Sequence, residues 1–222
     1  MNKVIRPVDW GLIEYNQAWK EQESIFAQTI SHKIQELETD NYLIFCEHPH
    51  VYTLGKSGDE QNLLLNYIQL QANNAQFVHT NRGGDITYHG PGQIVGYPIF
   101  DLANFGIGLK EYIHRIESCI IDLLQQYNIE SERLEGATGV WLDTGTNKAR
   151  KICAIGVRSS RYVTMHGFAL NINTDLSYFG HINPCGFTDK GVTSLEKELG
   201  EKQDMERVKA ALLEIFQKKF SI

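Results

Sequence analysis

Apolar residues recur at helical spacing in three stretches of this chain. The first runs from Asp9 to about Gln35, with Asp9 as its candidate N-cap. The second runs from about Gly108 to Tyr127, and the third from Met205 to Phe220. In the last two, apolar positions three and four residues apart form a continuous stripe, which is typical of a helix that packs one face against a core. We therefore expect three amphipathic helices.

Short apolar, β-branched runs predict the strands of a sheet. Tyr42–Cys46 and Ile94–Phe100 are almost wholly apolar and are expected to be buried strands. Two longer runs, Arg150–Arg158 and Tyr162–Asn173, are expected to pair with each other around Ser159-Ser160-Arg161. The sequence therefore predicts a sheet in addition to the helices.

The chain carries no internal repeat and no low-complexity linker. Thr193-Ser194-Leu195-Glu196 fits a capping box and Gly200 suits a helix end, which predicts one further short helix. At 222 residues the chain suits one sizeable domain. We expect an α+β fold: a single domain over residues 1–222, in which helices flank a mixed β-sheet.

Composition excludes several classes of protein. Hydrophobic residues make up 42% and charged residues 22%, as in ordinary globular domains. No apolar run approaches the roughly 20 residues that span a bilayer, and the first residues lack the apolar segment of a signal peptide. A net charge of −6 argues against nucleic-acid binding. We expect a cytoplasmic protein that binds neither membrane nor nucleic acid.

The cysteines and histidines do not form a metal-binding pattern. Cys46, Cys119, Cys153 and Cys185 are widely separated, with no C-x-x-C pair, and the histidines show no H-x-x-x-H spacing. Cys46 lies in an apolar strand and Cys119 beside a helical stripe, so both are expected to pack in the core. We expect no metal site and no disulfide framework.

Residues 148–161 concentrate basic charge. They hold five basic side chains and no acid: Lys148, Arg150, Lys151, Arg158 and Arg161. Such a segment on an acidic chain is consistent with docking of an acidic protein partner. It is equally consistent with a solvated basic hairpin, and charge alone does not decide between them.

The stretch Arg82–Gln93, RGGDITYHGPGQ, is the most informative candidate site. Four glycines allow close approach to the backbone, and Arg, Thr, Tyr, His and Gln side chains among them can donate or accept hydrogen bonds. A buried strand follows directly, so a rigid scaffold would present this loop. Composition alone also fits a surface hairpin.

A second glycine-containing segment imitates a phosphate-binding loop. Leu54-Gly55-Lys56-Ser57 ends like G-x-x-x-x-G-K-[ST], but His50 stands where the first glycine is required. Gly58-Asp59 follows in place of a helix start. We therefore expect no nucleotide binding there.

Two residues outside the glycine-rich loop are candidates for chemistry. Lys151 lies inside a predicted strand, where a buried ammonium is costly unless it is compensated, although an edge lysine can extend to water. Cys185 stands between Pro184 and Gly186, so it is expected in a turn, more exposed than a thiol inside a strand.

Blocks of residues across 47–186 resemble, in order, the signatures of the lipoyl (octanoyl) transferases. Besides the RGG-x-x-TYHGPGQ loop, they are EHP-x-VYTLG at 47–55, K-I-x-A-x-G at 151–156, HG-x-A-x-N at 166–171 and I-x-PCG at 182–186. The resemblance implies the fold shared by biotin protein ligases and lipoate ligases. It also implies transfer of an octanoyl group from octanoyl-acyl carrier protein to a lysine of a lipoyl domain, the first step of protein lipoylation.

The family's motifs assign roles to residues of this chain. By resemblance, Cys185 is the nucleophile that carries the acyl group as a thioester, and Lys151 is its catalytic partner. The implied substrate-binding residues are Arg82, Gly83, Gly84, Asp85, Ile86, Thr87, Tyr88, His89, Ala154, Ile155, Gly156, Gly167, Phe168 and Ala169. A thiol has an ordinary pKa of about 8.5, and a nearby ammonium lowers it by stabilising the thiolate. Backbone N–H groups of the glycine-rich loop could stabilise the developing oxyanion.

Cys153 is a rival thiol, because residues two apart on a regular strand face the same side, and Lys151 would then serve either. We prefer Cys185, since apolar neighbours surround Cys153.

The resemblance implies no cofactor, because a thioester is already activated and needs no ATP. The implied acceptors are lipoyl domains of 2-oxoacid dehydrogenases and the glycine cleavage H protein. One alternative is an ATP-dependent lipoate or biotin protein ligase of the same fold, and another is an inactive relative that only binds lipoyl domains. Acyl chain-length preference, the preferred acceptor and oligomeric state do not follow from the sequence.

Overall fold

The computed structural model describes residues 2–183 and 190–221. Within them, eight strands form a mixed sheet in the order β1-β2-β6-β10-β9-β8-β7, with β11 beside β9. The β1–β2 and β9–β11 pairs are parallel, and the other neighbours are antiparallel. The strands of this sheet are β1 Ile5–Leu12, β2 Asn41–Glu47, β6 Gln93–Ile99, β7 Glu132–Leu134, β8 Ala137–Leu142, β9 Arg150–Ser160, β10 Val163–Asn171 and β11 Gly191–Val192.

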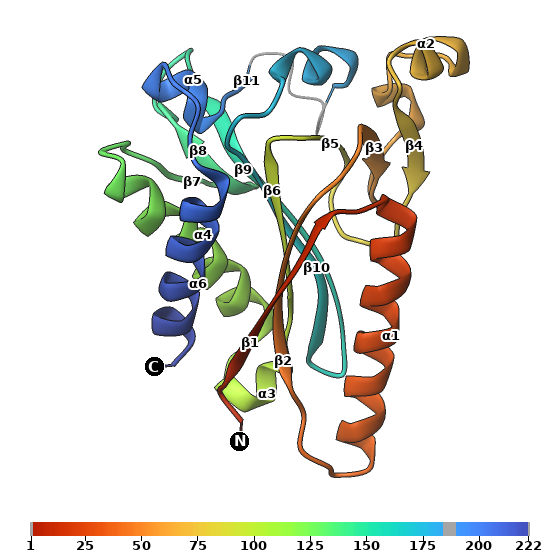
Figure 1. The fold of residues 1–222 in the computed structure, drawn as a ribbon, viewed down its shortest axis with the longest axis vertical. Helices are drawn as coiled ribbons and strands as arrows, with labels where there is room; N and C mark the ends of the chain where they lie inside the picture. The colour runs from red at the N-terminus through yellow and green to blue at the C-terminus, as the bar shows by residue number, and fades with distance from the viewer. Residues whose placement is uncertain (1, 184–189, 222) are drawn as a thin grey trace.

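Helices cover both faces of the main sheet. Figure 1 shows α1 along one face and α4 with α6 on the other. The expected α+β fold, with helices flanking a mixed sheet, is confirmed. The helices are α1 Tyr15–Ile34, α2 Tyr67–Ala72, α3 Leu102–Phe105, α4 Leu109–Gln126, α5 Leu195–Leu199 and α6 Met205–Phe220, with short 3₁₀ helices η1 Glu60–Asn62 and η2 Leu176–His181.

A second, smaller sheet stands beside one end of the main sheet. It has three strands in the order β4-β3-β5: β3 Val51–Leu54, β4 Gln76–His79 and β5 Ile86–His89. Its core joins Tyr52 and Tyr88 to the aromatic rings of Tyr178 and Phe179 from η2. The small sheet therefore belongs to the same packed body as the segment that follows β10.

The amphipathic pattern of α4 and α6 is confirmed, and both stripes pack in one core cluster with the main sheet. Cys46 and Cys119 are fully buried, as expected. The first expected helix was wrong at its start. Residues 5–12 form edge strand β1, and α1 begins after Glu14 rather than Asp9. Pairing with β2 prevails there over the local apolar spacing.

Two turn assignments also need correction. The β9–β10 turn is Arg161-Tyr162, and Ser159 and Ser160 stay in the strand ladder. The N-cap of α5 is Ser194, whose side chain accepts from the Lys197 backbone N–H, so Thr193 does not start a capping box. Gly200 ends that helix in a left-handed conformation, as expected.

Candidate active site

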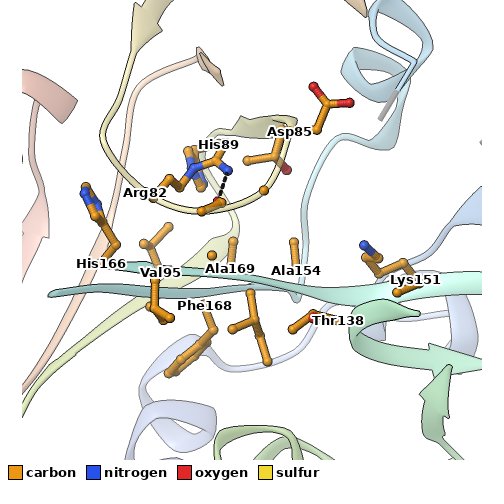
Figure 2. Close-up of a pocket in the computed structure, with 18 of the residues that line it drawn as sticks. Arg82, Asp85, His89, Val95, Thr138, Lys151, Ala154, His166, Phe168 and Ala169 are labelled. Atoms are coloured by element: carbon orange, nitrogen blue, oxygen red, sulfur yellow. Dashed lines mark hydrogen bonds between the residues drawn. The ribbon is translucent and has the colours of Figure 1, made fainter. Parts of the chain in front are cut away.

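A pocket of about 540 Å³ lies between the glycine-rich loop and the β9–β10 hairpin. Figure 2 shows the loop as a roof and the two strands as a floor, with Lys151 toward one end and His166 toward the other. The predicted substrate-binding residues converge here from three separate segments. Those lining the pocket are Arg82, Gly83, Gly84, Asp85, Ile86, Thr87, His89, Ala154, Ile155, Gly156, Gly167, Phe168 and Ala169.

Small residues form the floor. Ala154 pairs with Ala169 across the β9–β10 ladder, and Gly156 pairs with Gly167. Since neither pair carries more than a methyl group, the strand surface leaves a trough that an aliphatic chain could fill. A Cβ on Gly156 would lie 2.8 Å from the Gly83 carbonyl oxygen, so the roof rests directly on this glycine.

Arg82 fixes the roof to the small sheet. Its guanidinium is buried and donates from Nη2 to the carbonyl oxygen of Thr53 at 2.6 Å and to Thr53 Oγ1 at 2.9 Å. The Gly83 N–H donates to the Val157 carbonyl at 2.9 Å and is thereby committed to the scaffold. Arg82 thus supports the shape of the pocket, and the Gly83 N–H is not available to an oxyanion.

The segment that imitates a phosphate-binding loop supports the same roof. In this turn, residues 55–58, the N–H groups of Gly55, Lys56 and Ser57 donate to the carbonyls of Asp85, Arg82 and Gly84 at 3.3, 3.0 and 3.3 Å. A Cβ on Gly55 would lie 2.2 Å from the Gly84 oxygen. Because these N–H groups are already bonded to protein carbonyls, they do not form a phosphate cradle.

Tyr88 is the one predicted substrate-binding residue that does not line the pocket. It is buried in the small-sheet core, its hydroxyl lies 2.7 Å from His50 Nδ1, and its ring stacks on Tyr178. Alternation along β5 explains this, because Thr87 and His89 face the pocket and Tyr88 faces the other way.

Lys151 lines one end of the pocket, whereas Cys153 does not line it. Cys153 is fully buried in the core cluster shared with α4 and α6, and burial raises the pKa of its thiol. The expectation that both side chains face one side was wrong, because the β8–β9 register shifts between the Val140–Cys153 and Trp141–Lys151 pairs. This bulge breaks the regular alternation.

Cys185 lies outside the described residues, as do Pro184 and Gly186. The residues on either side of residues 184–189 are held near the pocket. The Asn183 N–H donates to the Asn62 carbonyl at 2.9 Å, and Asn62 Nδ2 donates to Asp85 Oδ2 of the roof at 2.8 Å. Lys190 lines the pocket, and Val192 pairs with Lys151 in the β9–β11 ladder.

Three buried histidines lie at or beside the pocket: His89 and His166 line it, and His48 packs against His89. His89 Nδ1 lies 2.8 Å from Gln93 Oε1, and Gln93 Nε2 donates to Asn171 Oδ1 at 2.9 Å, so His89 carries its proton on Nδ1. His48 donates from Nδ1 to the Ile13 carbonyl at 2.7 Å and accepts from the Tyr97 hydroxyl at 2.6 Å. These bonds fix neutral rings in set orientations.

Burial keeps all three rings neutral. It lowers the pKa of His48 to about 4 and that of His89 well below 6.5. Burial, followed by the nearby Arg82 and Arg158 charges, lowers the pKa of His166 to about 3. The His89 and His166 rings therefore add no charge to the pocket lining, which suits an aliphatic ligand.

Sequence reasoning missed several pocket residues. They include Tyr15 from α1, Tyr97 from β6, Trp141 from β8, and Lys190. His166 stood inside the matched HG-x-A-x-N block and could have been found from it. The others had no local signal, since only the packing of α1 and β8 against the hairpin brings them here.

Two of the five basic side chains in segment 148–161 pair with acids from elsewhere in the fold. Arg150 forms a two-pronged pair with Glu198, Nε–Oε1 and Nη2–Oε2 both at 2.7 Å, and also pairs with Asp143. Arg158 lies 3.6 Å from Glu23. Glu198 and Glu23 are distant in sequence, so these pairs could not be predicted from the segment's composition.

The described part of the chain shows neither a metal-binding cluster nor a membrane-spanning helix. Over residues 2–183 and 190–221, no three His, Cys, Asp or Glu side chains gather in a way that could hold a metal ion. Over the same residues, no helix has both the length and the apolar character to cross a membrane.

Comparison with known proteins connects the pocket to a family. The profile of the lipoyl protein ligase A/B catalytic domain matches residues 14–217. An octanoyltransferase of Bacteroides fragilis is 58% identical over 204 residues, which is 92% of each chain. An octanoyltransferase of Christiangramia forsetii is 55% identical over 227 residues, covering 99% of this chain and 97% of that one.

Solved structures show the same fold at low sequence identity. A bipartite lipoate protein ligase from Thermoplasma acidophilum superposes with a TM-score of 0.72 at 13% identity, over 98% of this chain and 84% of that one. Biotin protein ligase from Aquifex aeolicus superposes with a TM-score of 0.53 at 11% identity, over 98% and 70%. At such identities the likeness concerns the fold alone.

Proposed function

This chain belongs to the lipoyl protein ligase A/B catalytic-domain family and, within it, to the octanoyltransferases, and from that premise we propose a two-step transfer through Cys185. Octanoyl-acyl carrier protein is the donor. Lipoyl domains of 2-oxoacid dehydrogenases and the glycine cleavage H protein are the acceptors. The enzyme is an acyltransferase, and it acts without ATP.

The observation that carries the proposal is the pocket itself. Its alanine and glycine floor leaves an apolar trough, which leads along β9 toward the only lysine on that strand, Lys151. Burying the six methylenes and one methyl group of an octanoyl tail contributes roughly 5 kcal/mol, at about 0.8 kcal/mol per group. The tail would therefore dominate recognition, with its carbonyl carbon at the Lys151 end.

The anchors on either side of residues 184–189 support Cys185 as the nucleophile. Asn183 is tied through Asn62 to Asp85, and Lys190 lines the pocket immediately before β11. Cys46, Cys119 and Cys153 are all buried, and burial raises the pKa of each thiol. A reactive thiol needs access and a stabilised thiolate, so these three are unsuited to the role.

In the first step, the Cys185 thiolate attacks the donor thioester carbon. A new C–S bond forms, the bond to the carrier's pantetheine sulfur breaks, and the departing thiolate takes the proton of the Lys151 ammonium. In the second step, the neutral amine of the acceptor lysine attacks the Cys185 thioester. An amide forms, the Cys185 thiolate leaves, and neutral Lys151 takes the proton that the amine loses. The starting thiolate and ammonium are restored.

Intact-mass measurement after incubation with octanoyl-acyl carrier protein tests the intermediate. With ATP and magnesium absent, the wild-type protein should gain one octanoyl group, and Cys153→Ser should do the same. Cys185→Ser should form no thioester. A thioester mapped to Cys153, or none in wild type, would contradict the assignment.

Transfer to a lipoyl domain separates this function from its two rivals. We expect octanoylation from the carrier thioester without ATP, and none from free octanoate or lipoate when ATP and magnesium are supplied. ATP-dependent modification from the free acid, without thioester transfer, would establish a ligase instead. Binding of lipoyl domains with neither activity would establish a binding module.

Lys151→Met tests the activating role. We expect the pH midpoint of Cys185 alkylation by iodoacetamide to move to higher pH, because the thiolate loses its cation. Octanoyl transfer should fall by about 100-fold or more, within the range typical of general acid–base groups. An unchanged midpoint would show that another group activates the thiol.

A further inference from the structure

Lys151 rests on an aromatic ring. Its ammonium nitrogen lies 4.6 Å from the centroid of the Trp141 ring, on the neighbouring strand β8. Trp141 is only 2% exposed, and its indole Nε1 donates to the Ala137 carbonyl at 2.9 Å, which fixes the plane of the ring. An ammonium over an indole face is attracted by the ring quadrupole, most strongly where water is excluded.

Gly139, two residues before Trp141 on the same strand, makes room for the stem of Lys151. A Cβ on Gly139 would lie 3.5 Å from both Cδ and Cε of Lys151, and 2.5 Å from the Cys153 carbonyl oxygen. The φ of Gly139 is +128°, in the region that favours glycine. The lysine stem therefore passes over Gly139 before its ammonium reaches Trp141.

Glu117 of α4 ties this strand to the helical layer. Its carboxylate is buried and accepts from the Gly139 N–H at 3.0 Å and from Arg133 Nε at 2.9 Å. Arg133 also donates to the His114 carbonyl at 3.0 Å and to Ser118 Oγ at 2.6 Å. Arg133 supplies the counter-charge that makes burial of this carboxylate tolerable, and the carboxylate in turn holds the Gly139 N–H in place.

We propose that Gly139 and Trp141 form a lysine seat, and that Trp141 is a positioning residue which favours the ammonium form of Lys151 at the reaction end of the pocket. The inference rests on the proposed function, in which this ammonium stabilises the Cys185 thiolate. Glu117 of α4 anchors the lysine seat by accepting a hydrogen bond from the Gly139 N–H.

Among the described residues, other charged or titratable groups lie on the elements beside Lys151 or line the same pocket. They are Cys153 and Arg150 on β9, Glu198 on α5, Glu117 with Arg133 behind β8, and Arg82, Asp85 and Lys190 along the pocket. Arg150 with Glu198, and Arg133 with Glu117, are paired charges that largely offset each other. Trp141 differs from all of these, since its ring stabilises the cation without adding a counter-charge.

The lysine seat should influence both proton transfers of Lys151. After the first step Lys151 is neutral and has lost its attraction to the ring. The ring then favours the return of a proton, which the attacking acceptor amine supplies in the second step. Trp141 should therefore affect the rates of both steps more than the affinity for the donor.

The test compares Trp141→Phe and Trp141→Leu with wild type, using the pH dependence of Cys185 alkylation. We expect the midpoint to rise by about 0.5–1 pH unit in Trp141→Leu and by less in Trp141→Phe, which keeps a weaker ring. Single-turnover acylation should fall by about 3–10-fold in Trp141→Leu, in line with that shift. KM for octanoyl-acyl carrier protein should change less than kcat.

Leu142→Ala is the matched control. Leu142 is buried on the same strand but packs in the opposite core, so its truncation should lower the melting temperature without moving the alkylation midpoint. If Trp141→Phe and Trp141→Leu lower the melting temperature and leave the midpoint at its wild-type value, Trp141 is structural only and the inference is overturned. Should Trp141→Leu not fold, the same comparison with Trp141→Phe decides.

The two proposals fail in different ways. If wild type forms no Cys185 thioester, the proposed function itself fails. If Lys151→Met leaves the midpoint unchanged, the activating role of Lys151 fails, and the lysine seat fails with it. If both of those results are as expected and neither tryptophan variant moves the midpoint, only the lysine seat fails.

Discussion

At the scale of single residues, the buried histidines make the protein sensitive to acid. His48, His89 and His166 have pKa values lowered by burial, whereas the same side chains in the unfolded chain titrate near the ordinary value of about 6.5. Below that value the unfolded state binds protons that the native state does not. The stability that these three neutral rings contribute is therefore present above pH 6.5. It is lost as the pH falls from 6.5 toward the folded-state pKa of each ring.

We predict a loss of about 1.4 kcal/mol for each histidine per pH unit below 6.5, or about 4 kcal/mol for the three at pH 5.5. Urea unfolding at pH 7.5 and 5.5 measures it. In His48→Gln the loss should be smaller by about one third, because one titrating group is gone. An equal loss in wild type and His48→Gln would assign the acid sensitivity to other groups.

At the scale of elements, the glycine beneath the roof controls the height of the pocket. Gly156→Ala should push the 82–87 loop away from β9, because its Cβ would meet the Gly83 oxygen at 2.8 Å. We expect octanoyl transfer to fall by about 10-fold or more, with a loss of stability of about 1–3 kcal/mol. Gly145→Ala is the control, since a Cβ there has nothing within 4 Å. Equal activity in the two variants would show that the roof adapts.

The β9–β10 turn stores strain that can be relieved. Arg161 and Tyr162 have φ of +50° and +65°, in a two-residue turn of the type that favours Asn-Gly. Tyr162→Gly should raise the free energy of unfolding by about 1 kcal/mol, since the left-handed conformation costs about 1–2 kcal/mol for other residues. The hydrogen bond from the Leu102 N–H to the carbonyl of residue 162, 2.8 Å long, would be kept in Tyr162→Gly. Tyr162→Val should be less stable than wild type; the opposite order in urea unfolding would refute this account.

Elements with strong periodicity could be predicted from the sequence, and those set by distant partners could not. The stripes of α4 and α6 and the apolar runs of β2 and β6 carried their own signal. β1 did not, because it is an edge strand with mostly exposed residues. The Arg161-Tyr162 turn had no glycine or asparagine to mark it.

In the candidate site too, residues carried by a local motif could be predicted from the sequence, and contacts set by distant partners could not. The loop, Lys151 and the β9–β10 residues were predictable because short motifs carry them, and the fold brings them into one pocket. Tyr88 belongs to the same motif but does not line the pocket, because the motif does not say which side of β5 a residue faces. Trp141 was missed because its relation to Lys151 exists only across the β8–β9 pair.

At the scale of the whole molecule, ion pairs between distant segments join the sheet to its helices. Arg150 of β9 binds Glu198 of α5, and Lys209 of α6 lies 2.8 Å from Asp9 Oδ2 of β1. Both basic side chains are substantially buried. We therefore regard Arg150 as a structural contact more than a docking charge.

Replacement of Arg150 by alanine should lower the free energy of unfolding by about 2–3 kcal/mol, because a two-pronged, charge-assisted pair is lost and Glu198 is left half-buried. Lys148→Ala, an exposed neighbour in the same basic segment, should change stability by less than about 0.5 kcal/mol. Thermal and urea unfolding of the two variants would decide. Equal stabilities would mean that the Arg150 pair contributes little.

The turn at residues 55–58 has a consequence for hydrogen exchange. Lys56 and Ser57 are exposed residues, and amides in such turns usually exchange within the dead time of the experiment. Here their N–H groups are bonded to the carbonyls of the roof, so they can exchange only when the roof lifts. Their protection factors would therefore measure how often the pocket opens in the absence of any ligand.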